Sequence, residues 1–334
     1  MPNILNPLLK FSTWARRRFA GGGRSTGLVG IGFSSQGIAL ARIETAQERP
    51  RLTLLDFQPC DTPQAWGMTL TELAKRHGLQ GQPCVGCLEG QSYQFIPLAH
   101  PGLADAELRE ALRWQVREML NFPAEEAVTD YLEPPVQRSG SRILVAVAQQ
   151  SIVADRAQLI QQAGFNLVAM DVRETALRNL ASRLPQNRQG VALIGFSWED
   201  GLLTVSHQGR LVVTRTLDTG ERSLRNRIPD GDDWNDATIV VLDHLVLEVQ
   251  RLFDYHDSHF QQPPVAALFL PPGTRRAPIF ERYFRANLSV NVLTLDLKEI
   301  FEIGEDLSPE QQNLCLFAVG AAARCLDGEN ADQA

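Results

Sequence analysis

Two short turns hold the residue types in this sequence that could bind a phosphate group. Ile31-Gly32-Phe33-Ser34 recurs as Ile194-Gly195-Phe196-Ser197, and each copy leads through a polar turn into a strand that opens with glycine. Small residues let backbone N–H groups approach an anion, so two such turns at a domain interface could clamp a nucleotide. The candidate contacts are Gly32, Ser34, Ser35, Gly195 and Ser197. The alternative is a pair of β-hairpins whose turns are small only because hairpin geometry is tight.

Other groupings of reactive side chains give weaker signals. Cys84 and Cys87 form a lone C-x-x-C motif without a second pair at zinc spacing, so we expect two small residues in a buried strand. His256 and His259 could share a zinc ion, but no third ligand is evident. The acidic stretch 230–236 lacks the glycine and the glutamate of a calcium loop. We therefore expect no metal site and no catalytic residue from these patterns.

The net charge is distributed unevenly along the chain. Residues 1–26 contain five basic side chains and no acid, so the overall charge of −7 leaves −12 for the remainder. A body this acidic is repelled by phosphates, which argues against nucleic acid as a partner. Five cysteines, an odd number without a paired framework, are typical of a reducing compartment.

The basic N-terminal arm, residues 1–26, also carries apolar bulk. The residues that could contact a membrane or a partner are Leu8, Leu9, Phe11, Trp14, Arg16, Arg17 and Arg18. Apolar and aromatic side chains followed by a basic cluster are typical of a peripheral anchor on an anionic membrane. A tail that orders only against a neighbour is the alternative. No apolar run approaches the roughly 20 residues that cross a bilayer, and no secretory signal is present, so we expect a cytoplasmic protein.

Strands and helices alternate along most of the body, which predicts an α/β fold. We expect strands at 28–33, 37–44, 51–58, 83–88, 94–98, 142–148, 166–172, 190–196, 202–207, 210–217, 264–270 and 290–295. We expect helices at 69–77, 105–119, 151–163, 243–255, 279–286 and 310–326. The recurrence of a strand, a small-residue turn and a returning strand indicates two similar domains.

A series of short motifs follows the same order along residues 27–326. The motifs are Leu108-Arg109-Glu110-Ala111-Leu112-Arg113-Trp114, Asn121-Phe122-Pro123, Asp130-Tyr131, Ala163-Gly164-Phe165, Leu247-Glu248-Val249-Gln250-Arg251 and Ala318-Val319-Gly320-Ala321-Ala322-Ala323-Arg324. In this order they resemble the actin-like pilus-assembly family of the PilM type, which is close to the cell-division protein FtsA in architecture. Within that family they look most like the MshI branch, which serves the mannose-sensitive haemagglutinin (MSHA) pilus.

The resemblance implies duplicated actin-like (ribonuclease-H-like) domains, with a small α/β subdomain inserted in the first. We expect the basic arm and a glycine linker at 1–26, actin-like domain 1 at 27–188 with its insertion at about 92–166, and actin-like domain 2 at 189–314. A terminal helix at 315–327 would return to domain 1, and a tail would follow at 328–334.

The departures from the family pattern bear on activity. Nucleotide-binding relatives carry an aspartate and a glycine in each phosphate turn, where this chain has Gly32 and Ser34, then Gly195 and Ser197. The adenosine-side loop contains Gly273. We therefore expect no carboxylate beside either bend, no means of holding magnesium, and no ATP hydrolysis. Weak binding of ATP without a metal ion remains an alternative.

The resemblance also implies a partner and a place. We expect a non-catalytic cytoplasmic scaffold, peripheral on the inner membrane, that receives the cytoplasmic tail of a PilN-like membrane protein. The tail would lie in a groove between the core of domain 1 and its insertion, among apolar side chains near residues 92–135. The alternatives are an ATP-binding or ATP-hydrolysing enzyme of pilus assembly and a self-associating filament former.

Overall fold

The computed structural model describes residues 27–45, 49–60, 62–135, 142–228, 235–273, 277–304 and 307–326. The candidate residues of the basic arm lie outside these ranges, as does most of the acidic stretch 230–236. Among the described residues, no helix combines the length and the apolar character needed to cross a membrane.

Two of the three sheets in the described part of the chain repeat one topology. The first has the strand order β14-β3-β2-β1-β4-β8, and the second has the order β11-β10-β9-β12-β13. The first sheet consists of β1 (Leu28–Ser34), β2 (Gly37–Glu44), β3 (Arg51–Pro59), β4 (Pro83–Cys87), β8 (Asn166–Asp171) and β14 (Glu302–Ile303). The second consists of β9 (Val191–Phe196), β10 (Gly201–His207), β11 (Arg210–Leu217), β12 (Ala267–Leu270) and β13 (Asn291–Thr294).

Each large sheet begins with a three-stranded antiparallel meander and continues with two parallel strands. β1 pairs antiparallel with β2 and parallel with β4, just as β9 pairs antiparallel with β10 and parallel with β12. The strands β9 to β13 therefore repeat the arrangement of β1 to β4 and β8. This is a duplicated actin-like architecture, so the expected fold class is confirmed.

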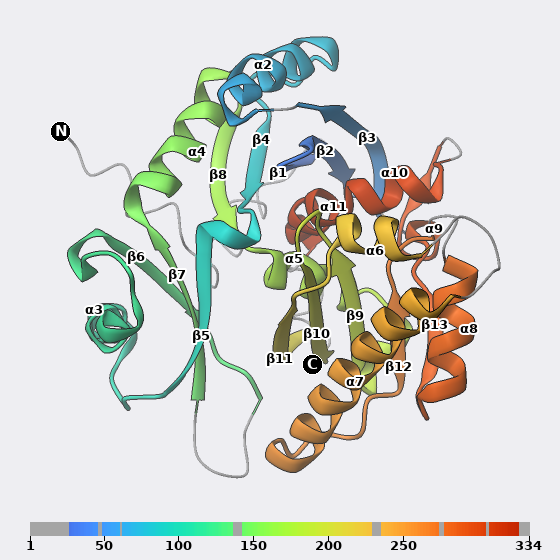
Figure 1. Cartoon of the computed structure of the whole chain (residues 1–334). Coiled ribbons are helices and arrows are strands. Elements are labelled where there is room, and N and C mark those ends of the chain that lie inside the picture. The colour runs from blue at the N-terminus through green and yellow to red at the C-terminus, as the bar shows by residue number, and fades with distance from the viewer. Residues whose placement is uncertain are drawn as a thin grey trace.

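The third sheet is small and antiparallel, with the order β5-β7-β6. Its strands are β5 (Tyr93–Ala99), β6 (Ala127–Leu132) and β7 (Arg142–Gln149). The helix α3 (Asp105–Gln115) covers one face, where Leu108 and Leu112 pack with Val145. The other face packs toward the first large sheet through Ala146 and Ala148. Figure 1 shows this unit beside the two large sheets.

Helices cover the outer faces of the large sheets and fill the space between them (Figure 1). The outer helices are α2 (Trp66–Arg76) and α4 (Gln150–Gln162) on the first sheet, and α7 (Asp236–His259) and α8 (Ala277–Asn287) on the second. Between the sheets lie α5 (Arg173–Ala181) and α11 (Leu316–Ala322). Shorter helices are α6 (Glu221–Arg227), α9 (Leu297–Ile300) and α10 (Pro309–Leu314). We call the first sheet with its helices the first lobe, and the second sheet with α6, α7 and α8 the second lobe.

Small residues let the central helices approach the first sheet and each other. A Cβ at Gly30 would lie 1.9 Å from the carbonyl oxygen of Ala318, and a Cβ at Gly320 would lie 2.3 Å from that of Ala176. Asn179 in α5 donates a hydrogen bond of 2.9 Å to the Gly320 carbonyl. The alanine- and glycine-rich end of the chain is therefore explained by a close crossing of backbones.

Some expected helices differ from the structure. The helix expected at 105–119 ends at Gln115 and continues as a separate 3₁₀ turn. The helix expected at 310–326 is broken at Cys315, whose ψ of 4° is not helical, so α10 and α11 are distinct. The helix α5 could not be predicted, because it is buried on nearly all sides and lacks an apolar stripe of helical period.

Candidate functional site

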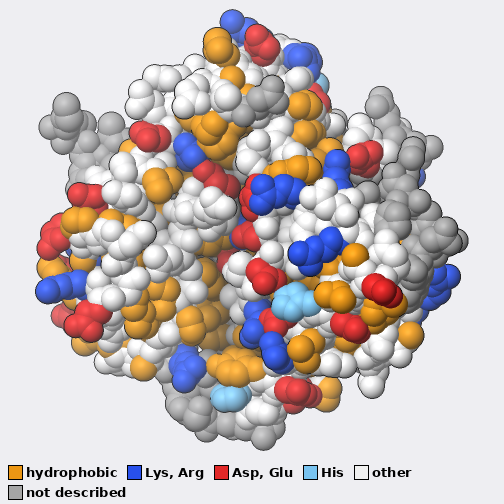
Figure 2. Space-filling model, in the orientation of Figure 1, with side chains coloured by type: hydrophobic (Ala, Val, Ile, Leu, Met, Phe, Trp, Pro, Cys, Tyr) orange, Lys and Arg blue, Asp and Glu red, His pale blue; other side chains and the backbone are white. Residues whose placement is uncertain are grey.

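A pocket of about 150 Å³ lies between the two lobes, where the repeated turns face one another. Its apolar wall is formed by Phe33, Leu88, Phe196, Trp198 and Phe317, among others. Both turns contribute to the lining, and so do the start of α5 and the start of α6. Figure 2 shows charged side chains of both signs gathered around this cleft. The volume falls well short of the roughly 300–1,000 Å³ of typical small-molecule sites.

The first turn is uncharged and is closed by its own hydrogen bonds. Ser34 pairs with Gly37 across the hairpin, which leaves a loop of two residues. The Ser34 hydroxyl donates to the Gly37 carbonyl at 3.0 Å and accepts from the backbone N–H of Gln36 at 3.3 Å. This serine is therefore engaged in shaping its own turn.

The second turn is longer and acidic, which corrects the expectation that neither bend has a carboxylate beside it. Phe196 pairs with Gly201, so the loop spans four residues and contains Glu199 and Asp200. The backbone N–H of Ser197 donates to the Asp200 carbonyl at 2.8 Å, and the Ser197 hydroxyl donates to the Asp200 carboxylate. The sequence-based expectation considered only Gly195 and Ser197, the positions that match the family's phosphate turn, and not the two acidic residues that follow them.

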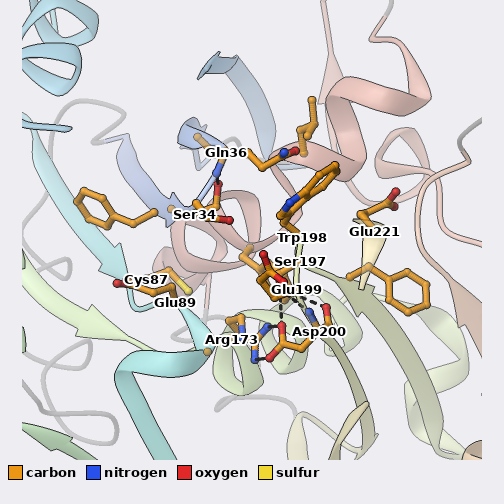
Figure 3. Close-up of a pocket in the computed structure, with 18 of the residues that line it drawn as sticks. Ser34, Gln36, Cys87, Glu89, Arg173, Ser197, Trp198, Glu199, Asp200 and Glu221 are labelled. Carbon is orange, nitrogen blue, oxygen red and sulfur yellow. Dashed lines mark hydrogen bonds and ion pairs between the residues drawn. The ribbon is translucent and has the colours of Figure 1, made fainter. Parts of the chain in front are cut away.

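Asp200 forms an ion pair with the other lobe. Arg173, the first residue of α5, donates from Nη1 to Oδ1 at 2.7 Å and from Nη2 to Oδ2 at 2.9 Å (Figure 3). Arg173 is only 4% exposed, and its guanidinium lies 5.6 Å from the centre of the Phe317 ring. A Cβ at Gly90 would lie 2.0 Å from Nη2, so only glycine at that position leaves room for the arginine.

The remaining carboxylates of the pocket are paired as well. Glu89 binds Arg156 at 2.5 Å, and Glu199 binds Arg222 at 2.5 Å. Glu221 lies 3.7 Å from the arginine four residues later, and its carboxylate accepts from the Asn313 amide at 2.9 Å. Among the described residues, no three histidine, cysteine or acidic side chains gather as a metal site would require. The charges around the pocket thus neutralise one another.

A second buried network lies at the start of α5. The Tyr93 hydroxyl donates to Glu174 at 2.5 Å and accepts from the backbone N–H of Arg173 at 3.2 Å. Burial raises the pKa of the Glu174 carboxyl, while Arg173 and the hydrogen bond from Tyr93 oppose part of that rise. Burial, followed by the charge of Glu174, raises the pKa of Tyr93. Tyr93, the first residue of the small sheet, is therefore hydrogen-bonded both to Glu174 and to the backbone of Arg173.

The structure brings together most of the expected contact residues. Gly32, Ser34, Ser35 and Ser197 all line the pocket. Gly195 does not, because it lies beneath the site, where a Cβ would be 3.1 Å from the Phe317 ring. Gly273 is also absent from the lining.

Arg173 and Asp200 were not predicted from the sequence. For Asp200, the only signal was the length of the turn that contains it. Three residues separate Phe33 from Gly37, whereas four separate Phe196 from Gly201. The longer spacing indicated a different turn. Nothing in the sequence indicated that Arg173 would meet it.

The other groupings occupy ordinary structural positions. Cys84 and Cys87 both lie buried in β4, but they belong to cores on opposite faces of the sheet. Burial raises the pKa of both thiols, which disfavours the thiolate that metal binding requires. His256 is buried and bonds to Asp257 at 2.8 Å, whereas His259 stacks on Tyr255.

Comparisons with known proteins bear on the small sheet and on the whole fold. Residues 93–237 match the model of the family described as "Type IV pilus assembly protein PilM", which confirms the resemblance of this part of the chain to that family. The solved structure "PilM-PilN type IV pilus biogenesis complex" is similar with a TM-score of 0.71 and 20% sequence identity, covering 90% of this chain and 98% of that chain. No curated protein matches the sequence significantly.

Two further solved structures resemble the chain less closely. One is a protein of unknown function with an actin-like ATPase fold from Bacteroides thetaiotaomicron, with a TM-score of 0.48, 10% identity, and coverage of 87% of this chain and 96% of that chain. The other is the cytoplasmic domain of EpsL, an inner-membrane component of the type II secretion system of Vibrio cholerae, with a TM-score of 0.47, 9% identity, and coverage of 92% and 95%.

Proposed function

We propose that the protein is a non-catalytic scaffold of a type IV pilus assembly platform, working on the cytoplasmic side of the inner membrane. The observation that carries the proposal is the match of residues 93–237 to the PilM family model. The matched stretch includes the small sheet, α3 and the whole meander of the second lobe, β9 to β11. A scaffold of this kind acts by binding partners and needs no reacting group.

The electrostatics of the interlobe pocket favour a scaffold over an ATPase. Phosphoryl transfer requires positive charge and a metal ion to neutralise the phosphates. Here Arg173 is committed to Asp200, and Arg225 lies beside Glu221. A triphosphate would bring several negative charges into a cleft whose cations already have partners, and the pocket is too small to enclose it.

We further propose that the partner is the cytoplasmic tail of a PilN-like membrane protein, and the similarity to a solved PilM-PilN complex supports a partner of that kind. The tail would lie where the small sheet meets the core of the first lobe. There Phe95, Val128 and Leu132 are only partly buried and pack against the cluster that contains α2 and α4 residues. An extended peptide can bury apolar side chains on such a surface without a cofactor.

Titration of the full chain with a synthetic tail peptide tests this proposal. Val128→Asp should raise the dissociation constant at least tenfold, which is a loss of about 1.4 kcal/mol in binding free energy, because it places a charge among apolar contacts. Val240→Asp on α7 is the matched control, since Val240 is 61% exposed, and it should bind like wild type. Equal affinities of the two variants, or no binding by wild type, would overturn the proposal. If Val128→Asp fails to fold, Phe95→Ala takes its place.

Finer assignments follow from the sequence. We propose that the protein belongs to the MshI branch and serves an MSHA-like pilus, so that a tail from that system should bind more tightly than tails from other type IV pili.

We also propose that the basic arm attaches the body to an anionic membrane surface. Deleting residues 1–24 should reduce flotation with vesicles containing anionic lipid, and unchanged flotation would contradict this role. Self-association remains a separate proposal, which sedimentation over a range of concentrations would test.

A further inference from the structure

We infer that the Arg173 guanidinium is the anion-binding group of the interlobe pocket and that the Asp200 carboxylate is its built-in ligand. The pair joins the two lobes in the place that a bound oxyanion could otherwise occupy. This inference goes beyond the proposed function and does not depend on the identity of any partner.

The geometry of the pair is that of a recognition contact. Arg173 follows β8 of the first lobe after one intervening residue, and Asp200 lies in the β9–β10 turn of the second. Two parallel N–H···O bonds of 2.7 and 2.9 Å connect them. A guanidinium uses this same fork for carboxylates and for phosphates, so a phosphate could take the place of the carboxylate.

The surroundings require an anion at this point. Arg173 is 4% exposed, held between the Gly90 backbone and the Phe317 ring. A buried cation without a partner is strongly destabilising, so some acceptor must face it in the folded protein. Asp200 is the acceptor that the fold supplies, and Ser197 fixes its carboxylate with a further hydrogen bond (Figure 3).

The guanidinium also has capacity that Asp200 does not use. Its Nε is buried and has no hydrogen-bond partner among the described residues. Arg173 lines the pocket of about 150 Å³. Once the Asp200 carboxylate is removed, this space and the freed fork of Nη1 and Nη2 make a site for a small tetrahedral oxyanion. Inorganic phosphate is the simplest probe of that class.

The test compares three forms of the full chain by thermal unfolding during titration with sodium phosphate, with sodium chloride holding the ionic strength constant. Asp200→Ala should lower the apparent Tm by several degrees, and phosphate should restore part of that loss in a saturable way. Wild type should respond little, because its own carboxylate fills the site. The double variant Arg173→Met with Asp200→Ala should respond no more than wild type, which controls for the general stabilising effect of phosphate.

Equal responses of Asp200→Ala and the double variant would overturn the inference. If Asp200→Ala does not fold, Asp200→Ser removes the carboxylate and vacates the space while keeping a small polar side chain in the turn, and the same comparison decides. Either result leaves the peptide titration unaffected, so failure here is distinguishable from failure of the proposed function.

Discussion

The two turns that face the interlobe pocket began from the same sequence motif but now differ in what holds them. The first turn has two loop residues and is closed by the Ser34 hydroxyl within its own hairpin. The second has four loop residues, and its Asp200 is held by Arg173 from the other lobe. The two copies therefore share their strands but not the role of their loops. The first turn bonds only within its own lobe, through Ser34 and through the Gln36 carbonyl that accepts from the Cys60 N–H, whereas the second joins the two halves of the molecule.

The largest expected effect comes from breaking the interlobe pair on the arginine side. Arg173→Ala leaves the Asp200 carboxylate without its partner and removes the packing on Phe317. We expect a loss of about 3–5 kcal/mol in the free energy of unfolding, measured by urea denaturation. Ser35→Ala in the first turn is the control and should change stability by less than about 0.5 kcal/mol. Similar losses in both variants would mean that the turns do not differ as described.

The glycines that the repeat places in register should also respond differently. An added Cβ at Gly195 would lie 3.1 Å from the Phe317 ring and 3.3 Å from Leu316, whereas at Gly32 the nearest atom is 3.6 Å away. We therefore expect Gly195→Ala to cost about 1–2 kcal/mol through overpacking, and Gly32→Ala to be nearly neutral. Thermal melts of the two variants side by side check this. The reverse order would contradict the packing shown here.

The pH dependence of stability tests the network beside Arg173. Burial raises the folded-state pKa of Glu174 above its ordinary value of 4.5. The favourable contribution of the protonated Glu174 to the stability of the fold is therefore fully present below pH 4.5 and is lost as pH rises through the folded-state pKa. Glu174→Gln should therefore gain stability relative to wild type as pH rises. The effect should be smaller than that of Arg173→Ala, and denaturation at a series of pH values measures it.

Glu248 provides a control of opposite sign in the second lobe. Burial alone would raise its pKa, but hydrogen bonds and charges from Arg215 and Arg251 outweigh burial and lower it. Its contribution is present above 4.5 and is lost as pH falls through the folded-state pKa. Glu248→Gln should therefore lose stability relative to wild type at neutral pH and recover it in acid. Parallel profiles for the two variants would refute the assignment.

The smallest expected effect is in the first turn. Ser34→Ala removes the hydroxyl that bonds to the Gly37 carbonyl and to the Gln36 N–H. The cost should be about 0.5–1.5 kcal/mol, the ordinary worth of such hydrogen bonds, since the strands on either side remain paired. Urea denaturation gives the value. A loss as large as that of Arg173→Ala would contradict the difference between the two turns.

Much of the fold could be predicted because its signals are local or repeated. Alternating strands and helices gave the α/β class, and the recurrence at Ile31 and Ile194 gave the duplication. The break at Cys315 was missed because the stretch around it is rich in good helix formers, and only tertiary packing decides where it bends.

The central feature of the candidate site could not be predicted in the same way. Arg173 and Asp200 belong to different lobes and have no characteristic spacing, so their pairing is a property of the folded molecule. The helix that presents Arg173 is buried on nearly all sides and has no amphipathic pattern to reveal it. Glu199 and Asp200 of the second turn are visible in the sequence. They have no counterpart in the shorter first turn, so matching the two turns position by position left them out.

Thermal unfolding of the full chain during titration with ATP and magnesium shows whether the interlobe pocket binds a nucleotide, because any ligand that binds the native state raises its apparent stability. A pocket whose charges are already matched within the protein predicts no saturable rise in Tm, with or without magnesium. A saturable, magnesium-dependent rise in Tm accompanied by release of phosphate would overturn the non-catalytic assignment, because it would mean that the pocket opens and uses its carboxylates for catalysis.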